Sequence, residues 1–363
     1  MENLDEKLGQ MVIIRMQGKQ VSEELIEMIR QYKIGGIVLY SSNYDSIDSM
    51  INIINELKEI NKKYNKYPLF ICTDQEGGRV NRMPKEFKNL KSSGKLIKNE
   101  DVELVERAGD VVGKMLSRVG YNVDFAPVLD IQRFDDAHAI GDRCFGKLKE
   151  DVSKFAIPYM KKLKENKIIP VVKHFPGHGA TTKDSHLMLP IVSKPLDELE
   201  RNDMEPFKDA INENVDAIMA SHMIISKIDR LYPTSISRKI IKKYLKQELN
   251  YQGLIVTDDL KMKSISIIYG YKRAFIRAIF AQNNMIIIGT NYNNVKQAIK
   301  NAKKIILRKT VLQQIVEESA NKIIAKKKEY GITDNKIEKL SQEEIEEINK
   351  GIEEINSQVI IAK

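Results

Sequence analysis

Short runs of apolar, largely β-branched residues recur along the chain, and Gly, Pro, Asn or Asp bounds each of them. Almost no polar position interrupts these runs, which is the pattern of parallel strands buried on both faces of a sheet. They predict eight strands, at Met11–Ile14, Ile34–Tyr40, Leu69–Thr73, Val123–Val128, Ile168–Val172, Ala217–Ser221, Leu254–Thr257 and Met285–Ile288.

Helical patterns fill the segments between the runs. One apolar helix face is formed by Ile47, Met50, Ile51, Ile54 and Leu57, and a second by Ile240, Ile241, Tyr244, Leu245 and Leu249. Further helices are predicted at Ser22–Tyr32, Asp101–Arg118, Asp151–Lys164, Leu196–Ile211, Tyr271–Ala281 and Asn294–Ile306. Eight strands, each followed by a helix, predict an α/β chain folded as a (β/α)8 TIM-type barrel. An open doubly wound sheet is the alternative, but eight such units in about 300 residues favour closure.

The alternation stops after Leu307. Two long helices are predicted instead, at Thr310–Lys328 and Gln342–Ile360. The second begins with Ser341 and Glu344 at capping-box spacing, and an apolar stripe follows at Ile345, Ile348, Ile352 and Ile355. We therefore expect a single domain, with a barrel over residues 1–307 and a helical extension over 308–363 packed on its outside. An oligomer contact along the stripe is the less favoured alternative.

Composition excludes several classes of protein. Hydrophobic residues make up 42% of the chain and charged residues 30%, which excludes a wholly disordered protein. The 59 Lys and Arg against 50 Asp and Glu give a net charge of +9, but lysine is spread along the whole chain. No basic patch or nucleic-acid module stands out, so we expect no nucleic-acid partner, and the charge at most favours anionic ligands.

The chain shows neither a membrane segment nor a disulfide pattern. No run approaches the roughly eighteen apolar residues of a membrane helix, and the start is acidic where a secretory signal would be basic. Cys72 and Cys144 lie too far apart for a CxxC site and are too few for a disulfide framework. These features predict a cytoplasmic protein without a membrane partner, and we expect a monomer. Export of a longer form is compatible with the same sequence.

Polar side chains gather where the predicted strands end, and barrel enzymes place their chemistry at the carboxyl ends of their strands. These residues are Asp74, Glu76, Arg79, Arg82, Asp124, Asp130, Lys173, His174, His178, Asp184, His186, His222, Asp258 and Asp259. Asp130 fits a helix N-cap. Of the adjacent Asp258 and Asp259, one is expected to cap a helix and the other to face the pocket.

A metal or cofactor site is not indicated. His174 and His178 have the spacing of a helical metal pair, but Pro176, Gly177 and Gly179 break any helix there, so no metal site is expected. The chain contains neither GxGxxG nor GxxxxGK[ST], so no nucleotide cofactor is expected, and it has no GxSxG nucleophile elbow. Lys173 beside His174 points instead to a hydroxyl-rich or anionic ligand.

Four segments, in order along the chain, resemble one enzyme family. They are DQEGGR at Asp74–Arg79 with Arg82, IGDRCF at Ile140–Phe145, KHFPGHG at Lys173–Gly179 with Asp184-Ser185-His186, and TDDLKM at Thr257–Met262. This set is similar to the β-N-acetylglucosaminidases of glycoside hydrolase family 3, in the bacterial cell-wall recycling branch, over roughly Leu8 to Thr290. Ala281–Met285, AQNNM, departs from a more usual glycine–acid pair, at a place without a catalytic role.

The resemblance implies a role for each of eight residues. Asp258 is the implied nucleophile, and His186 is the implied general acid/base with Asp184 as its partner. The implied N-acetylglucosamine site consists of Asp74, Arg82, Arg143, Lys173 and His174. An imidazole, with an ordinary pKa of about 6.5, can both donate and accept a proton near neutral pH. If a carboxylic acid served instead, Glu76 would be the first to consider.

The function implied is a retaining exo-β-N-acetylglucosaminidase that removes terminal β-linked N-acetylglucosamine from peptidoglycan fragments through a covalent glycosyl-Asp intermediate. Its partners would be N-acetylglucosamine-containing saccharides or muropeptides. The alternatives are a β-N-acetylglucosaminide phosphorylase or a broader β-glycosidase of the same family, and, outside catalysis, a sugar-binding barrel.

Overall fold

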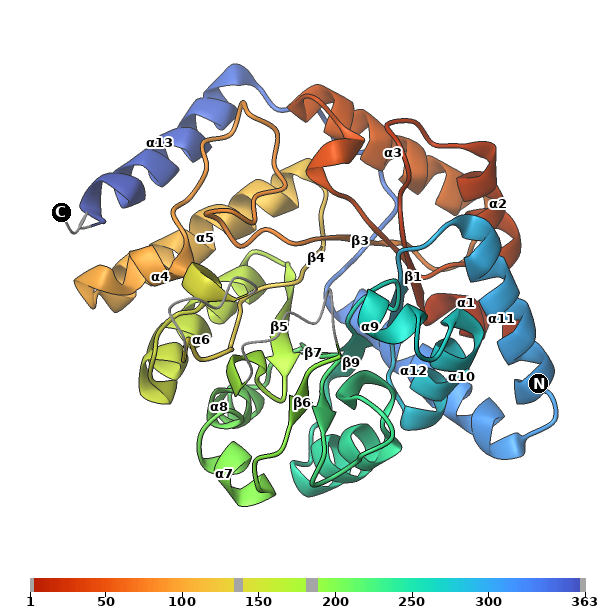
Figure 1. The fold of residues 1–363 in the computed structure, drawn as a ribbon. Helices are drawn as coiled ribbons and strands as arrows, with labels where there is room; N and C mark the ends of the chain where they lie inside the picture. Colours follow the sequence, from red (N-terminus) through yellow and green to blue (C-terminus); the bar gives the residue numbers. More distant parts are fainter. Residues whose placement is uncertain (1–2, 134–139, 181–188, 360–363) are drawn as a thin grey trace.

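A closed ring of eight parallel strands forms the centre of the computed structural model, which describes residues 3–133, 140–180 and 189–359 (Figure 1). The strands are β1 (Val12–Arg15), β2 (Gly36–Val38), β3 (Phe70–Thr73), β4 (Val123–Asp124), β5 (Ile169–Phe175), β7 (Ala217–Ala220), β9 (Leu254–Thr257) and β10 (Ile286–Ile288). Their order is β10-β1-β2-β3-β4-β5-β7-β9, and a parallel bridge between Val256 and Met285 joins the two ends. The predicted (β/α)8 barrel is therefore confirmed, and the doubly wound sheet is excluded.

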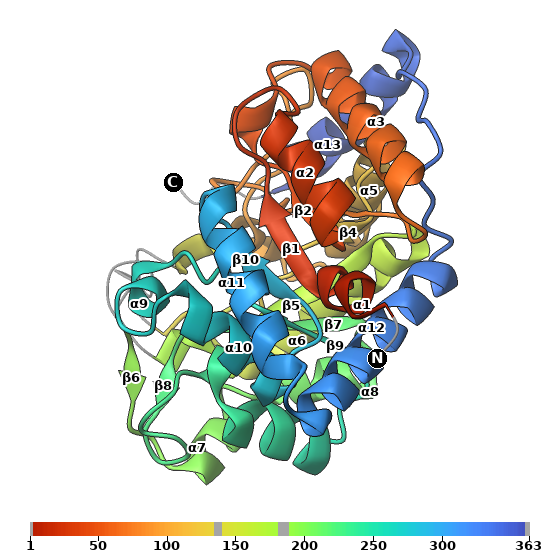
Figure 2. The same cartoon turned by 90° about the vertical axis from the view of Figure 1, so that its right-hand side faces the viewer.

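Helices surround the ring, as a second view shows (Figure 2). They are α1 (Leu4–Gln10), α2 (Glu23–Tyr32), α3 (Ile47–Tyr64), α4 (Ser93–Leu96), α5 (Val102–Val119), α6 (Lys149–Glu165), α7 (Leu196–Arg201), α8 (Glu205–Asn212), α9 (Lys263–Ser266), α10 (Tyr271–Ala281), α11 (Tyr292–Ile306), α12 (Thr310–Glu329) and α13 (Gln342–Gln358). A π-helix covers Lys239–Glu248, where the sequence predicted an ordinary helix. None of the described helices is long and apolar enough to span a bilayer.

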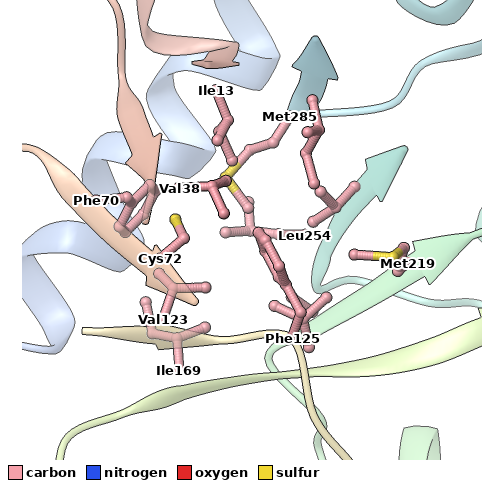
Figure 3. Packing of buried hydrophobic residues seen from close by; sticks show 14 of the residues in the cluster. Ile13, Val38, Phe70, Cys72, Val123, Phe125, Ile169, Met219, Leu254 and Met285 are labelled. Atoms are coloured by element: carbon pink, nitrogen blue, oxygen red, sulfur yellow. The ribbon is translucent and has the colours of Figure 1, made fainter. Parts of the chain in front are cut away.

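The core fills the inside of the barrel rather than leaving a channel. Side chains from successive strands meet there, among them Ile13, Val38, Cys72, Val123 and Ile169 (Figure 3). All five have no more than 1% of their surface exposed. Since close-packed side chains hold every strand from within, the loops after the strands rest on a rigid base.

Three predicted boundaries were wrong for local reasons. The fourth predicted strand is only two residues long, because Pro127 follows closely and proline has no N–H to donate to a sheet ladder. Strand β5 runs on to Phe175 and so includes Lys173 and His174.

The helix predicted at Leu196–Ile211 is split into α7 and α8. Pro206 lies in the first turn of α8, where its missing N–H breaks no helical hydrogen bond. A small additional sheet pairs β6 (Ile191–Val192) with β8 (Ile224–Ile225).

Helix α12 reaches the end of the barrel opposite the carboxyl ends of the strands. The ammonium of Lys327, 1% exposed, donates to Gln10 Oε1 at 2.7 Å and to the carbonyls of Gly35 at 2.9 Å and Pro68 at 2.6 Å, just before β1, β2 and β3. Burial lowers the pKa of this lysine to about 7. The three acceptors match the three donors of an ammonium, so Lys327 ties α12 to the barrel floor.

Helix α13 lies along α5, at the outside of the barrel (Figure 1). Its residues Ile348, Ile352 and Ile355 are buried, so the apolar stripe packs within the chain. The expected capping box is present, with Ser341 Oγ accepting from the Glu344 N–H and Glu344 Oε2 accepting from the Ser341 N–H. The division of the chain at residue 307 stays a prediction.

Candidate active site

A cavity of about 540 Å³ opens at the carboxyl ends of the strands, within the usual range for ligand pockets of about 300–1,000 Å³. Six residues proposed from the sequence line it together: Asp74, Arg82, Arg143, Lys173, His174 and Asp258. They come from segments that are far apart along the chain and that the barrel brings to one rim. The other two, Asp184 and His186, lie outside the described residues.

Four charged side chains form a clamp at the inner end of the cavity. The buried Lys173 ammonium donates to Asp74 Oδ1 at 2.7 Å and lies 2.6 Å from Glu76 Oε1. Arg143 forms a two-pronged ion pair with the same Glu76, through Nε at 2.7 Å and Nη2 at 2.8 Å. Asp74 and Arg143 keep part of their surface open to the cavity, so the clamp presents both an acceptor and a donor to a hydroxylated ligand.

Glu76 is a fixed anion rather than a proton donor. Burial alone would raise its pKa, but Arg143 and Lys173 outweigh burial and hold the pKa of Glu76 well below its usual range. A carboxylate that stays ionised has no proton to give to a leaving group. The alternative of Glu76 as the general acid is therefore disfavoured, and its place is in holding the two cations.

We expect Glu76→Gln to lower the free energy of unfolding at pH 7 by about 3–5 kcal/mol, because two buried cations lose their shared anion. The sign of the pH effect follows from the lowered pKa. The contribution of Glu76 is fully present above its unfolded pKa of about 4.3 and is lost as pH falls toward the lower folded value. The difference in the free energy of unfolding between wild type and Glu76→Gln, measured by urea unfolding, should therefore become smaller below about pH 4.

A matched control is Glu213→Gln, which removes one partner of an exposed ion pair with Lys161. Since surface substitutions of this kind usually change stability by less than about 0.5 kcal/mol, the control should unfold like the wild type. Equal stabilities of all three proteins at pH 7 would contradict the clamp.

Asp130 is not a helix N-cap, contrary to expectation, since no helix begins at residues 131–133. Its buried carboxylate instead holds the segment after β5. Oδ2 lies 2.6 Å from His174 Nδ1, and Oδ1 accepts from the His174 N–H at 3.2 Å and the His178 N–H at 2.6 Å. Burial raises the pKa of Asp130, but His174 and His178 outweigh it and the net pKa is lowered. The carboxylate thus fixes the imidazole of His174, which lines the cavity.

The two adjacent aspartates after β9 differ in their surroundings. Asp259 Oδ1 accepts from the N–H groups of Lys261 at 2.9 Å and Gly289 at 2.7 Å, and burial raises the pKa of Asp259. A Cβ at Gly289 would come within 2.2 Å of Asp259 Oδ2, so only glycine fits there. Asp258 lines the cavity, and its Oδ1 accepts the Asp259 N–H at 2.7 Å. Asp259 therefore organises the turns, whereas Asp258 faces the ligand space.

His222 and Asp124, also considered from the sequence, are buried beneath the site. His222 Nδ1 lies 2.7 Å from Ser235 Oγ, and its Nε2 lies 3.0 Å from the carbonyl of Asp259. Asp124 Oδ1 accepts the Gln75 N–H at 2.8 Å, and burial raises its pKa well above the usual range. Both support loops that carry cavity residues, and neither lines the cavity.

Sequence reasoning missed an aromatic–cation group on the cavity wall. The guanidinium carbon of Arg15 lies 4.3 Å from the ring centroid of Tyr40, and that of Arg82 lies 5.2 Å from it. Burial raises the pKa of Tyr40, so its hydroxyl is neutral. The buried Nε of Arg82 has no hydrogen-bond partner among the described residues, so it is a donor without an acceptor at the cavity. The only sequence signal was that Arg15 directly follows the first predicted strand and Tyr40 ends the second.

The described ranges hold no group of three His, Cys, Asp or Glu side chains placed to bind a metal ion. The groups that the described residues present to the cavity include the Asp258 carboxylate, the charged clamp and the His174 imidazole oriented by Asp130.

Comparison with known proteins places this site in a family. The glycosyl hydrolase family 3 N-terminal domain matches residues 3–325. Curated relatives named β-hexosaminidase include one from Haemophilus influenzae, 30% identical over 297 residues that cover 80% of this chain and 83% of the relative. Another, from Photobacterium profundum, is 32% identical over 284 residues, covering 78% and 82%.

The fold also matches solved structures of the same family. The structure of a glycoside hydrolase family 3 β-N-acetylglucosaminidase from Paenibacillus superposes on this chain with a TM-score of 0.92 at 28% sequence identity, and the match covers 99% of this chain and 69% of that one. The sequence resemblance is thus confirmed by an independent match of fold. The chain therefore belongs to glycosyl hydrolase family 3 and is a glycoside hydrolase of the β-hexosaminidase type.

Proposed function

We propose that the protein is a retaining exo-β-N-acetylglucosaminidase that removes terminal β-linked N-acetylglucosamine from peptidoglycan fragments. The observation that carries this proposal is the placement of Asp258 in one cavity with the Asp74–Lys173–Glu76–Arg143 clamp. The clamp offers charged hydrogen-bond partners to the hydroxyls of a terminal sugar, and Asp258 offers the carboxylate that attacks it.

The reaction would proceed in two displacements. In the first, Asp258 attacks the anomeric carbon, the bond to the leaving sugar breaks, and a covalent glycosyl-Asp forms. In the second, water attacks the same carbon from the opposite face to the Asp258 bond and frees the carboxylate. Two inversions leave the product with the configuration of the substrate.

A histidine is the proposed proton carrier, because the other cavity carboxylates are engaged. Glu76 is held ionised, Asp74 accepts from Lys173, and Asp259 holds two backbone N–H groups. We assign His186 to this role, with Asp184 stabilising its protonated form, on the strength of the family motif. Asp130 and His174 are a second carboxylate–imidazole pair at the cavity, and they are the competing assignment.

Arg82 provides a test of sugar binding. Its buried Nε lacks a partner among the described residues, and a ligand hydroxyl would supply one. A charge-assisted hydrogen bond contributes about 1.5–3 kcal/mol, so Arg82→Met should lower kcat/KM on 4-nitrophenyl N-acetyl-β-glucosaminide by roughly ten- to a hundredfold. Arg82→Lys keeps the charge but loses Nε, so its kcat/KM should lie between the values for the wild type and Arg82→Met. An unchanged kcat/KM in Arg82→Met would place the residue outside the sugar site.

A β-N-acetylglucosaminide phosphorylase is the second candidate, because the cavity carries more cations than acids and would also attract phosphate. Product analysis with and without phosphate distinguishes the two. Free N-acetylglucosamine in both cases supports the hydrolase, and N-acetylglucosamine 1-phosphate would support the phosphorylase. Absence of turnover on any N-acetyl-β-glucosaminide would contradict both.

We also propose a cytoplasmic location, since both cysteines are buried free thiols, as is usual in a reducing compartment. The monomeric state and the muropeptide substrate stay predictions.

A further inference from the structure

Two neighbouring loops expose large apolar side chains to water. Ile267 and Ile268, which follow α9, are 76% and 55% exposed, and Leu231, in the loop after β8, is 71% exposed. The loops are joined by the Tyr269 hydroxyl, which donates to the Leu231 carbonyl at 2.7 Å, and by the rings of Tyr232 and Tyr269, whose centroids lie 6.0 Å apart. These five residues therefore form one patch, which we call the apolar tip.

The sequence around the apolar tip lacks acidic residues. Residues 260–316 contain eleven lysines and arginines and no aspartate or glutamate, so this one stretch carries more positive charge than the net +9 of the whole chain. It forms α9, α10, β10 and α11, which lie together on one side of the barrel (Figure 1, Figure 2). A surface with many cations and no acid attracts anions.

Two cations next to the apolar tip have no carboxylate partner among the residues that the structure describes. Lys272 and Arg273 lie in the first turn of α10, just after the tip, and both are exposed. Lys303, farther along the same stretch, is in contrast paired with Asp5. The charges of Lys272 and Arg273 are therefore available to an anion outside the protein.

The loop that carries Leu231 adds a third cation, and its acid is buried. Arg230 is exposed and forms no ion pair with a described residue. Asp229 is 5% exposed, and its carboxylate accepts from the Ser237 hydroxyl at 2.7 Å and from the Leu231 N–H at 3.1 Å. The apolar tip is thus bordered by exposed cations on both loops.

The combination of aliphatic side chains and cations favours one kind of anionic partner. A nucleic acid or an anionic polysaccharide would bind the cations but leave Ile267, Ile268 and Leu231 in water. A second copy of the chain would bring a like charge against the apolar tip. An anionic lipid surface offers phosphates to the cations and an apolar interior to the aliphatic side chains.

We propose that the apolar tip docks on a membrane surface that contains anionic phospholipids. The aliphatic side chains of the tip enter the boundary between headgroups and acyl chains, and Arg230, Lys272 and Arg273 contact the phosphates. Contact of this kind needs no membrane-spanning helix. It departs from the expectation, drawn from the sequence, that the protein has no membrane partner, and it does not depend on the proposed function.

Sedimentation of the full chain with vesicles tests the proposal. The vesicles consist of phosphatidylcholine alone, or of phosphatidylcholine and phosphatidylglycerol in equal parts. We expect the wild type to bind the phosphatidylglycerol vesicles at least about tenfold more tightly, and added salt to weaken that binding. Lys272→Gln/Arg273→Gln should bind them roughly thirtyfold more weakly, because two cations leave the anionic surface. Ile267→Ser/Ile268→Ser should lose at least about tenfold, because less apolar surface is buried.

Leu307→Ser is the matched control for the apolar side chains. Leu307 is 54% exposed and lies in the same basic stretch, but it follows the end of α11, away from the apolar tip. Its substitution should leave vesicle binding unchanged. Thermal unfolding near the wild-type temperature shows that each variant is folded, as expected for substitutions of exposed side chains.

Three kinds of result would overturn the proposal. Equal binding of the wild type to both kinds of vesicle, or binding to neither, contradicts docking on anionic lipid. Unchanged binding in Ile267→Ser/Ile268→Ser, or a greater loss in Leu307→Ser, places the contact elsewhere on the protein. A dimer in sedimentation velocity without vesicles, dissociated by Ile267→Ser/Ile268→Ser, assigns the apolar tip to a second copy of the chain.

Discussion

Asp258→Ala is expected to abolish turnover almost completely, by a factor on the order of 10⁴ or more in kcat, because the nucleophile itself is removed. Asp258 follows a rigid strand and faces the cavity, and the other carboxylates among the described lining residues are engaged by Lys173, Arg143 or backbone N–H groups. The fold should survive, since the Asp258 side chain is partly exposed and lies at the cavity rather than in the core. Thermal unfolding of the variant near the wild-type temperature checks that point.

Covalent labelling identifies the nucleophile directly. A 5-fluoro N-acetylglucosaminyl fluoride keeps the acetamido group, and its ring fluorine slows both displacements while the good leaving group lets the first proceed. The glycosyl-enzyme should accumulate, and fragmentation of the labelled peptide should place the sugar on Asp258. Asp258→Ala should remain unlabelled. A label on Asp259 or Asp74 would contradict the assignment.

His186→Ala is expected to lose far more activity on a natural disaccharide than on a nitrophenyl glycoside. A poor leaving group needs a proton as it departs, whereas nitrophenolate leaves without one. The second displacement should then become limiting on the nitrophenyl substrate, since water lacks its base. Added azide, which needs no base, should restore turnover and yield the β-glycosyl azide. Asp184→Asn should show a milder form of the same behaviour, because the imidazole remains.

His174→Ala is the matched comparison, since His174 also pairs with a carboxylate at the cavity. If His174 binds the sugar, its loss should lower kcat/KM by a similar factor for good and poor leaving groups, and azide should not rescue it. The reverse pattern, with leaving-group dependence and azide rescue in His174→Ala alone, would transfer the proton-carrying role to the Asp130–His174 pair.

The sequence predicted the elements whose signal is local. Unbroken apolar runs such as Leu254–Thr257 are strands at the predicted place, and the Ser341 capping box begins α13 as expected. The residues after the strands converge because a closed parallel barrel brings all carboxyl ends to one rim. That topology alone collected six of the eight proposed site residues into one cavity.

What the sequence missed depends on contacts between distant segments. Asp130 resembled a helix cap, but its carboxylate holds a backbone more than forty residues later, at His174 and His178. Nothing local in the sequence distinguishes Arg15 from any surface arginine. Its place follows only from the adjacent ends of β1 and β2, which bring Tyr40 beneath it.

Double displacement through Asp258 determines which anomer of the product is formed first. Proton NMR of the wild-type reaction on a β-N-acetylglucosaminide, recorded before mutarotation, reports which anomer of N-acetylglucosamine is released. Double displacement releases the β anomer first, and the α anomer should grow in only as the sugar equilibrates. Initial release of the α anomer would mean a single displacement by water, and it would contradict a covalent intermediate on Asp258.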